Sequence, residues 1–516
     1  MYLSIFLPWL LCIPLFVHSS PHEPTGLLIS CGSETKQTVP DTGVTYIPDD
    51  GFTLVGNKTA LQTKDKLLPI LTTLRYFPDT AARKYCYTFQ AIKGSKYLVR
   101  TIYYYGGFDS GNEPPVFDQI IGGTKWSLVN TTEDYANGLS SYYEIILVAS
   151  IKTLSVCVAR NNHTVSSPFI SAIEVISLED SMYNSTDFGA HALVTVARSR
   201  FGHEDTISFP EDPYYRLWQP FKDDNEGVVS SQPSLSTSDF WNKPPPEAFA
   251  TGLTTSAGKK LDVKWPPVPL PSTRYYISLY FRDNRPPKTT STWRVFNVAV
   301  NGETFYNNLN VTTDGVTVYA AEWPLSGHTL ISLTPDAKSS IGPLINAGEI
   351  YQVMPLGGQT LMQDAIAMEE VSRSFDNPPS DWTGDPCLPH ENSWTGVTCS
   401  NEKMPRVSSL DLSNFGISGV LDANINNLTA LHHLWLGGNK LSGSIPEMYS
   451  LTQLETLHLE NNSFSGPVPK SFATLKGVHE IFLQGNKLDG PIPRRLQEKK
   501  GITIRVSPKY HLSVRW

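Results

Sequence analysis

Charged residues are scarce in this 516-residue chain. They make up 17% of it, and the formal net charge of −8 is spread without a basic stripe or a long acidic tail. Nucleic acid is therefore not expected as a partner, because its phosphates require clustered lysine and arginine. After residue 20, no apolar run approaches the roughly 18–20 residues that cross a bilayer. The mature chain is expected to be soluble, unless a membrane-spanning segment follows Trp516.

Signatures of catalysis are also missing. The sequence has no Gly-x-Ser-x-Gly elbow, no His-Glu-x-x-His motif, and neither the glycine-rich loop nor the His-Arg-Asp stretch of a kinase. No cysteine or histidine spacing indicates zinc. Asp109, Glu113 and Asp118 lie close in sequence, but a glycosidase needs two carboxylates across a cleft, and loop acids in a secreted β protein are usually solvated. We expect no enzyme activity, no metal and no cofactor.

The first twenty residues, MYLSIFLPWLLCIPLFVHSS, contain no acidic residue, lysine or arginine. Pro8 and Pro14 interrupt this apolar run, which favours a cleaved secretory signal peptide over a retained signal anchor. Seven Asn-x-Ser/Thr sequons agree with an extracellular chain. They lie at Asn57, Asn130, Asn162, Asn184, Asn310, Asn427 and Asn461.

Cysteine is rare, with six in the chain, and Cys12 is lost with the signal peptide. Export permits disulfides, and we expect the close pair Cys387 and Cys399 to be bonded. The other three are an odd number, so at least one is free or pairs outside the chain. They are Cys31, Cys86 and Cys157.

The strongest repeat signal lies after residue 405. Four units align: LDLSNFGISG (410–419), LWLGGNKLSG (434–443), LHLENNSFSG (457–466) and IFLQGNKLDG (481–490). Phe415, Asn439, Asn462 and Asn486 are equivalent, at spacings of 24, 23 and 24 residues. This leucine-rich-repeat period predicts a short α/β solenoid over 406–495, with a cap at 381–405 and a tail at 496–516. Trp382, Trp394 and the Cys387–Cys399 pair would cover the first repeat.

Residues between the two inward leucines of each repeat should face the concave surface of the solenoid. They are Asp411, Trp435, His458 and Phe482. Exposed aromatic side chains in a row suit a protein or peptide partner. A spacer role for so short a solenoid remains an equal alternative.

Before residue 356 the pattern is that of β-strands. Segments such as 96–109, 141–149, 274–284 and 294–305 are rich in β-branched and aromatic residues. The order of these segments is the same in the two halves of this region. PFISAIEVISL (168–178) in the first half also parallels PLINAGEIYQV (343–353) in the second. The fold class is therefore mainly β, with two tandem two-sheet antiparallel sandwiches at 24–180 and 183–356. A helical linker follows at 357–380, where Thr360 and Gln363 have capping-box spacing.

Several segments carry a family resemblance: LISCGS (28–33), TTLRYFP (72–78), KYLVR (96–100), SPFISAIEV (167–175), FPEDPYYRLWQPF (209–221) and PPPEAFATGL (244–253). They resemble the malectin-like ectodomain of plant receptor-like kinases, and the repeats resemble the leucine-rich repeats of plant receptor-like proteins. The resemblance spans about residues 25–493. Without a kinase part, the chain resembles a receptor-like protein or a soluble di-glucose-binding-type relative. Malectin resemblance implies a glucose-containing oligosaccharide as ligand.

Sugar recognition uses aromatic faces with flanking carboxylates or amides. The candidates are Tyr103, Tyr104, Tyr105, Phe108, Asp109 and Trp126 in the first module, and Tyr214, Tyr215, Trp218 and Trp241 in the second. Aromatic residues that alternate on a strand are more often core, and at least one of Tyr103–Tyr105 must face inward.

Two functional hypotheses stay open. In the first, an extracellular receptor-like protein of the apoplast binds an oligosaccharide or cell-wall glycan through its sandwiches, and the repeats contact a protein. In the second, the chain is a co-receptor for a peptide or a receptor kinase and binds no sugar. Attachment to the plasma membrane through a partner or a further segment is the alternative to secretion.

Overall fold

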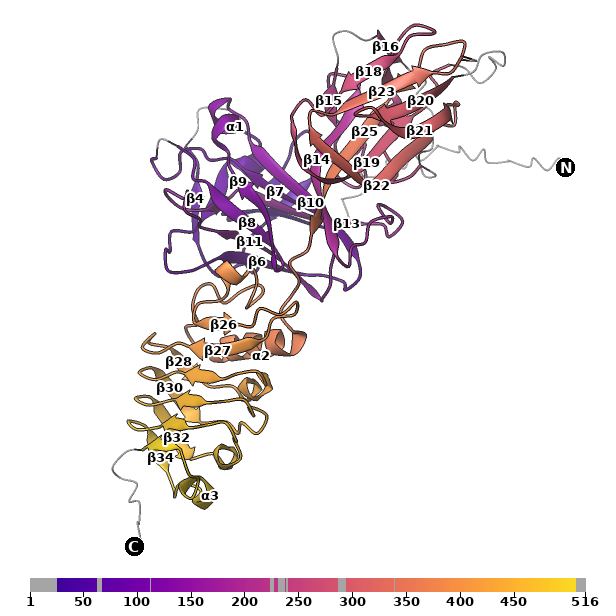
Figure 1. Ribbon diagram of the computed structural model, residues 1–516. Helices are drawn as coiled ribbons and strands as arrows, with labels where there is room; N and C mark the ends of the chain where they lie inside the picture. Colours follow the sequence, from indigo (N-terminus) through magenta and orange to yellow (C-terminus); the bar gives the residue numbers. More distant parts are fainter. Residues whose placement is uncertain are drawn as a thin grey trace, which may run out of the picture.

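The computed structural model describes residues 26–62, 67–111, 113–222, 227–230, 237, 240–285, 294–337 and 339–506. Two β-sandwiches lie side by side, and a stacked solenoid extends from the first of them (Figure 1). The predicted signal peptide lies outside the described residues. Among the described helices, none has the length and apolar character required to cross a membrane.

One large sheet runs through both sandwiches. Its strands are β1 (Gly26–Ser30), β2 (Gln37–Thr38), β3 (Thr45–Pro48), β7 (Lys96–Tyr103), β10 (Ser141–Val148), β13 (Ala172–Leu178), β14 (His191–Phe201), β15 (Gln219–Phe221), β19 (Leu270–Phe281), β22 (Val316–Gly327) and β25 (Ala347–Pro355). Their order is β2-β3-β1-β13-β7-β10-β14-β25-β19-β22, and β15 pairs with β14. The β1–β3 and β14–β15 pairs are parallel.

Smaller sheets complete each sandwich. In the first they are β6-β11-β8-β9 and β12-β5-β4, built from β4 (Asn57–Ala60), β5 (Thr73–Tyr76), β6 (Tyr85–Gln90), β8 (Phe117–Ile121), β9 (Thr124–Val129), β11 (Thr153–Ala159) and β12 (Phe169–Ile170). In the second they are β18-β23-β20-β21 and β16-β17-β24, built from β16 (Gly227–Ser230), β17 (Thr251–Thr254), β18 (Leu261–Lys264), β20 (Val295–Val300), β21 (Glu303–Asn310), β23 (Leu330–Pro335) and β24 (Leu344–Ile345).

Alternation of side chains explains these smaller sheets. In β18, Leu261 and Val263 are buried in the sandwich core, whereas Asp262 and Lys264 face solvent. Such a period of two marks a strand with one covered face. In β19, by contrast, every residue from Tyr276 to Phe281 is buried. This strand lies inside the large sheet and is covered on both faces.

The two sandwiches share one sheet, a feature that the prediction of two tandem sandwiches did not include. β14 pairs with β10 of the first sandwich and with β25 of the second, both antiparallel. The register shifts between Thr195 and Ala197 of β14, where the strand passes from one sandwich to the other. Pairing these strands satisfies backbone groups that two free sheet edges would expose. Strand periodicity carries no information about such pairing between repeats.

A row of buried charges crosses this junction. Arg100 on β7 contacts Glu144 on β10 at 2.6 Å (Nη2–Oε2), and the second oxygen of Glu144 accepts from Arg198 on β14 at 2.7 Å. Arg198 Nε continues to Glu349 on β25 at 2.9 Å. The side chains concerned are at most 2% exposed. Each guanidinium therefore bridges neighbouring strands, and one carboxylate joins the two sandwiches.

The segment between the sandwiches covers this row. The Tyr215 carbonyl accepts from Arg100 Nη2 at 2.7 Å, and the Tyr183 hydroxyl donates to Glu349 at 2.8 Å. Burial alone would raise the pKa of Glu144, but its two arginines, Arg198 and Arg100, lower this pKa to about 2. Glu144 is thus ionised and fully paired.

The solenoid docks onto the first sandwich through its cap. Gly384 lies against the Cys86–Cys157 disulfide: a Cβ on it would lie 2.9 Å from Cys86 Sγ and 3.3 Å from Cys157 Sγ. Buried Lys84 donates from Nζ to the carbonyls of Asp385 and Leu388, and burial lowers its pKa to about 8.

The Cys86–Cys157 disulfide also resolves the three cysteines whose pairing the sequence left open. Cys31 is the free one, and it is buried.

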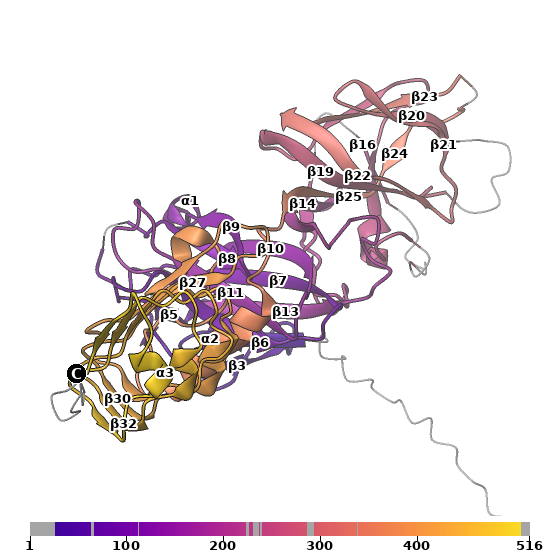
Figure 2. The same ribbon diagram turned by 60° about the horizontal axis from the view of Figure 1, so that its bottom comes forward.

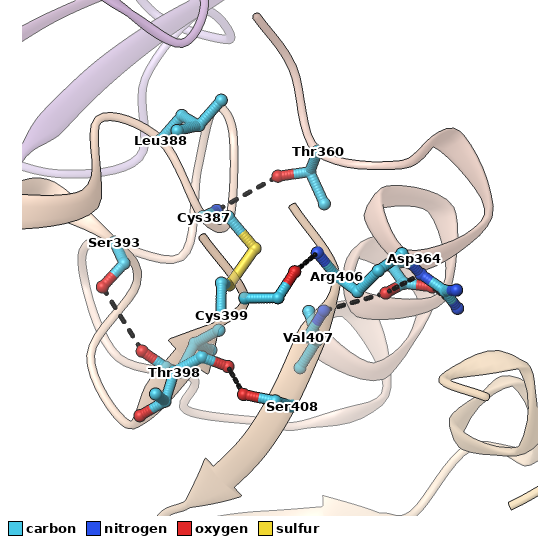
Figure 3. Close-up of a disulfide and its surroundings, with 12 residues drawn as sticks. Thr360, Asp364, Cys387, Leu388, Ser393, Thr398, Cys399, Arg406, Val407 and Ser408 are labelled. Carbon is cyan, nitrogen blue, oxygen red and sulfur yellow. Dashed lines mark hydrogen bonds and ion pairs between the residues drawn. A yellow bond between two sulfur atoms is a disulfide. The ribbon is translucent and has the colours of Figure 1, made fainter. Parts of the chain in front are cut away.

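The predicted disulfide Cys387–Cys399 is present and joins the loop of the cap to its strand β26 (Val397–Cys399), which pairs with the first repeat (Figure 3). On one side of it, the Thr360 hydroxyl accepts from Cys387 N at 3.2 Å. On the other side, Asp364 accepts from Val407 N at 2.9 Å. The chain that enters the solenoid is thereby fastened at both sides of the bridge.

The predicted linker helix is α2 (Met362–Ser374), and it is docked. Ala367, Met368 and Val371 are buried in the solenoid core. The prediction of a capping box is wrong, because α2 has no side-chain N-cap. The Thr360 side chain instead bonds to Asp385 in the cap of the solenoid, and Gln363 donates to the Asn427 carbonyl at 2.7 Å. Contacts with residues distant in sequence therefore take the place of a local N-cap on this helix.

The solenoid has a sheet on its concave side, in which all pairs except the antiparallel first one are parallel, and a second, parallel sheet beside it (Figures 1 and 2). The first contains β26 (Val397–Cys399), β27 (Val407–Asp411), β29 (His433–Trp435), β31 (Thr456–His458), β33 (Glu480–Phe482) and β35 (Thr503–Arg505). The second contains β28 (Ser418–Val420), β30 (Lys440–Ser444), β32 (Ser463–Pro467) and β34 (Lys487–Asp489). β35 lies in the segment that we predicted as a tail, and it adds a fifth repeat strand.

Short helical turns complete the chain. The α-helices besides α2 are α1 (Thr132–Ala136) and α3 (Arg494–Gln497), and the 3₁₀ turns are η1 (Pro69–Leu71), η2 (Pro246–Phe249), η3 (His390–Asn392), η4 (Ala423–Asn427) and η5 (Lys470–Ala473). In the solenoid, η4, η5 and α3 each follow a strand of the second sheet and return the chain to the concave side.

Buried asparagines hold adjacent repeats together. Asn462 donates from Nδ2 to the Leu436 carbonyl of the preceding repeat at 2.8 Å and accepts from Leu441 N at 3.0 Å. The equivalent position of the first repeat is Phe415, which is exposed. Asn377, in the segment between α2 and the cap, takes over part of this role, because its Oδ1 accepts from Ser418 N at 2.8 Å.

We predict that Glu144→Gln lowers the free energy of unfolding by about 3–5 kcal/mol, because two buried guanidinium groups lose their shared countercharge. Chemical unfolding followed by tryptophan fluorescence measures this loss. The control is Glu369→Gln, which removes an exposed ion pair with Arg373 and should cost under about 1 kcal/mol. Equal losses in the two variants would contradict the structural role of the buried row.

The same carboxylate makes stability sensitive to acid. Since its pKa is lowered from 4.5 to about 2, its contribution is complete above a pH of about 4.5 and is lost as the pH falls toward 2. Thermal unfolding of wild type and Glu144→Gln should therefore differ most near neutral pH, and the gap should narrow below a pH of about 4. A gap that widens in acid would show the opposite sign.

Gly384→Ala should weaken the dock between sandwich and solenoid. Gly384 has a φ of +71°, and Gly416, with a φ of +72°, has no atom within 4 Å of its Cβ position. Both alanine variants carry a backbone strain of about 1–2 kcal/mol, but only Gly384→Ala collides with the disulfide. Limited proteolysis should cut the segment between β25 and α2 faster in Gly384→Ala than in Gly416→Ala. Identical cleavage rates would argue against the dock.

Candidate functional site

The aromatic residues predicted to bind a ligand in the first sandwich lie mostly in its core. Tyr103, Tyr104, Tyr105 and Trp126 are all buried. The Tyr103 ring packs at 5.8 Å against Phe117 and at the same distance against other core rings. β7 ends at Tyr103, and all three consecutive tyrosines are buried because the chain is covered on both sides: Tyr103 and Tyr105 belong to one core cluster and Tyr104 to another. In this structure these rings face protein and offer no surface to a sugar.

Phe108 and Asp109 are half-buried, and their partners lie within the sandwich. Phe108 packs at 5.3 Å against Phe169. Burial opposes ionisation of Asp109, but hydrogen bonds from Ser166 and Tyr105 outweigh it and lower the pKa of Asp109. The carboxylate therefore fixes its own loop, and its hydrogen-bonding capacity is largely used within the protein.

The tryptophans of the second sandwich differ from each other. Trp218 is fully buried and donates from Nε1 to Asp212 at 2.7 Å, which makes it part of the junction. Trp241 is half-buried and stacks on Tyr319, with ring centroids 4.7 Å apart and planes 6° apart. Tyr319 is 42% exposed. The sequence did not single out Tyr319, which lies on the edge strand β22 and also stacks on Tyr276 at 6.2 Å.

The concave face of the solenoid brings together the residues predicted there. Parallel pairing places Asp411 beside Trp435, Trp435 beside His458, and His458 beside Phe482. The rings of Trp435 and His458 stack at 5.6 Å, and those of His458 and Phe482 stack at 4.4 Å. Arg505 on β35 lies 4.4 Å over the Phe482 ring. We call the row of Trp435, His458, Phe482 and Arg505 the concave strip.

Polar contacts hold the concave strip in place. Trp435 Nε1 donates to Thr456 Oγ1 at 2.7 Å, and His433 Nδ1 contacts the same hydroxyl at 2.9 Å. His458 Nε2 lies 2.9 Å from Glu480 Oε2. All the rings of the strip are half-buried. The strip is therefore preorganised and accessible along one edge. The sequence missed Arg505, because it was assigned to the tail.

The sequons lie at the surface in nearly every case. Asn427 is half-buried, and its Nδ2 donates to Asn424 at 2.9 Å. The exposed ones are Asn57, Asn130, Asn162, Asn184, Asn310 and Asn461. Among the described residues, no group of three or more histidine, cysteine or acidic side chains could hold a metal ion.

A fused pair of β-sandwiches that carries a short leucine-rich solenoid defines a receptor-type recognition architecture. The family model of the malectin-like domain matches residues 29–353, and models of the leucine-rich-repeat N-terminal domain and the leucine-rich repeat match 363–400 and 453–475. The chain belongs to the malectin-like domain family. The N-terminal repeat model includes most of α2, in agreement with its burial in the solenoid core.

Curated relatives are receptor-like kinases from Arabidopsis thaliana. A leucine-rich repeat receptor-like serine/threonine-protein kinase is 29% identical over 427 residues, which are 80% of this chain and 48% of that protein. The probable LRR receptor-like serine/threonine-protein kinase PAM74 is 30% identical over 407 residues, 76% of this chain and 44% of that protein. The chain thus spans about half the length of the curated relatives it matches.

Solved structures share the fold of the sandwiches. The ANXUR1 extracellular domain of Arabidopsis thaliana superimposes with a TM-score of 0.53 at 16% identity, over 64% of this chain and 97% of that one. A chain from the complex of plant peptide RALF23 with FER and LLG2 gives a TM-score of 0.52 at 19% identity, over 64% of this chain and 96% of that one. At such identities the likeness establishes the fold alone.

Proposed function

We propose that this chain is an extracellular receptor-like recognition protein whose solenoid binds a protein or peptide partner on the concave strip. The observation that carries the proposal is the row of half-exposed, stacked side chains that runs across neighbouring strands. Aromatic and arginine side chains on a rigid surface are the residues that dominate protein interfaces. A malectin-like fold also occurs in a solved complex with a peptide.

An extracellular location is part of the proposal. The six exposed sequons and the presence of two disulfides suit an oxidising, glycosylating compartment. In the apoplast, the chain would meet secreted peptides or the ectodomains of receptor kinases, with the plasma membrane as the alternative location if a partner or further segment anchors it. The sandwiches contribute a rigid base, because the cap docks directly onto β6 and β11 through the Cys86–Cys157 disulfide.

Carbohydrate binding by the sandwiches is the second candidate function. It is favoured by the Trp241–Tyr319 stack, since Tyr319 is the one member of the pair that is more than a third exposed. Sugar C–H groups pack on open aromatic faces. The buried candidates Tyr103, Tyr105 and Trp218 supply none in this structure.

Trp435→Ala should lower the affinity for a protein partner by about 30-fold, as loss of an interface hot spot costs about 2 kcal/mol. The partner is identified by cross-linking the secreted chain on plant cells and is then measured by surface plasmon resonance. Tyr449→Ala is the control, because Tyr449 is exposed on the same solenoid and lies outside the concave strip. A partner that binds both variants equally would contradict the proposal.

Tyr319→Ala tests the second function on a glycan array that is probed with the whole secreted chain. Hits confined to one oligosaccharide class that vanish in Tyr319→Ala would support sugar binding by the second sandwich. Tyr306→Ala is the control, since Tyr306 is equally exposed on β21 and takes no part in the Trp241 stack. Hits that survive Tyr319→Ala would place any sugar site elsewhere.

A further inference from the structure

The rings of the concave strip present their edges outward. Their planes are 20° apart between Trp435 and His458 and 10° apart between His458 and Phe482. Stacking of this kind across parallel strands turns the ring faces toward one another along the sheet. Arg505 covers the remaining face of Phe482, and His433 contacts Trp435 at 5.3 Å. Both faces of His458 and Phe482 and one face of Trp435 are thus covered, which leaves mainly ring edges for a ligand.

Ring edges select a particular chemistry. The edge of an aromatic ring carries partial positive charge, so it attracts carbonyl oxygens and the faces of other rings. A pyranose that needs an open ring face finds none on His458 or Phe482. An extended peptide offers carbonyl oxygens at regular intervals along its backbone and can add an aromatic side chain. The strip therefore suits a peptide and not a sugar.

Next to the strip lie two acceptors without donors. Glu460 and Gln484 follow His458 and Phe482 by two residues, and the ladder continues there through the bond from Asn461 N to the Gln484 carbonyl at 2.8 Å. Glu460 Oε2 and Gln484 Oε1 are buried and have no hydrogen-bond partner among the described residues. Leaving such atoms unpaired costs about 1–3 kcal/mol each, and more for a charged group.

The charge of Glu460 is also uncompensated. No ion pair involves it in the described part of the chain, whereas Glu480 is paired with His458. Gly437, two residues after β29 in the preceding repeat, has no side chain, and a Cβ there would lie 2.5 Å from Glu460 Oε1. The Glu460 carboxylate thus occupies the space that the missing side chain of Gly437 leaves.

We infer that the concave strip takes an extended peptide segment whose lysine or arginine reaches Glu460 and Gln484. An aromatic side chain of the same segment would pack on the ring edges of Trp435 and His458. The inference rests on the proposed function and names the chemistry of its partner. Complementary charge carries it: one unpaired carboxylate and one unpaired amide oxygen both require a donor, and a cationic side chain supplies several.

A phage library of random 12-residue peptides tests this inference on the whole glycosylated chain. Selected peptides should be enriched in lysine or arginine together with an aromatic residue. Calorimetry with the best synthetic peptide should then show an affinity at least about tenfold lower for Glu460→Gln, the size of a lost charge-assisted hydrogen bond. A selection without enrichment, or one that yields acidic peptides, would overturn the inference.

Charge reversal provides the sharper arm. Glu460→Lys should reject the selected peptide and accept its counterpart in which glutamate replaces the cation. Glu402→Lys makes the same change of charge at an exposed turn outside the strip, and it should leave both affinities unchanged. Thermal unfolding of each variant confirms that the solenoid is folded. No change in preference for Glu460→Lys would overturn the inference.

The outcomes separate this inference from the proposed function. If a natural partner no longer binds Trp435→Ala but still binds Glu460→Lys, the concave strip is the binding surface and the inference of a cationic peptide is wrong. If a partner binds both variants as well as it binds the wild type, the proposed function and the inference are both wrong.

Discussion

The architecture depends on one carboxylate, Glu144, held between two guanidinium groups that come from different sandwiches. Its two oxygens lie 2.6 Å from Arg100 and 2.7 Å from Arg198. An ion pair buried this deeply stabilises only if every charge is matched, because each desolvated ion costs several kcal/mol, on the order of its attraction to its partner. The chain meets this condition by extending the row to Glu349 and by covering it with the segment around Tyr183 and Tyr215. The junction is therefore specific in register.

A continuous series of packed contacts connects this junction to the solenoid. The large sheet fixes one sandwich on the other, and the Gly384 loop fixes the first sandwich on the cap. The cap continues into α2, whose Met368 and Val371 share a core with the leucines of the repeats. A partner held on the concave strip is consequently held at a defined distance and angle from both sandwiches.

Period and motif predicted a large part of the fold. Repeated leucines placed the solenoid strands and their concave residues, and the Cys387–Cys399 pair and the helix after residue 360 followed from local patterns. Contacts between distant segments were beyond such patterns. The sharing of β14, the pairing of Cys86 with Cys157 and the bonds of Thr360 all depend on tertiary neighbours. For the site, position on a repeat identified Trp435, His458 and Phe482. In the sandwiches, aromatic content could not distinguish a core ring such as Tyr105 from an exposed one such as Tyr319.

The single sheet through both sandwiches also constrains how such a protein can be inherited. A duplicated β module normally remains a unit that recombination can move or delete alone. Here, removal of the first copy would strip β14 of its neighbour β10 and Arg198 of Glu144, whereas removal of the second copy would expose the edge of β10 and leave Glu144 without Arg198. A change that moves or deletes one copy therefore disrupts the other, and the malectin-like match accordingly runs unbroken over 29–353, across both copies.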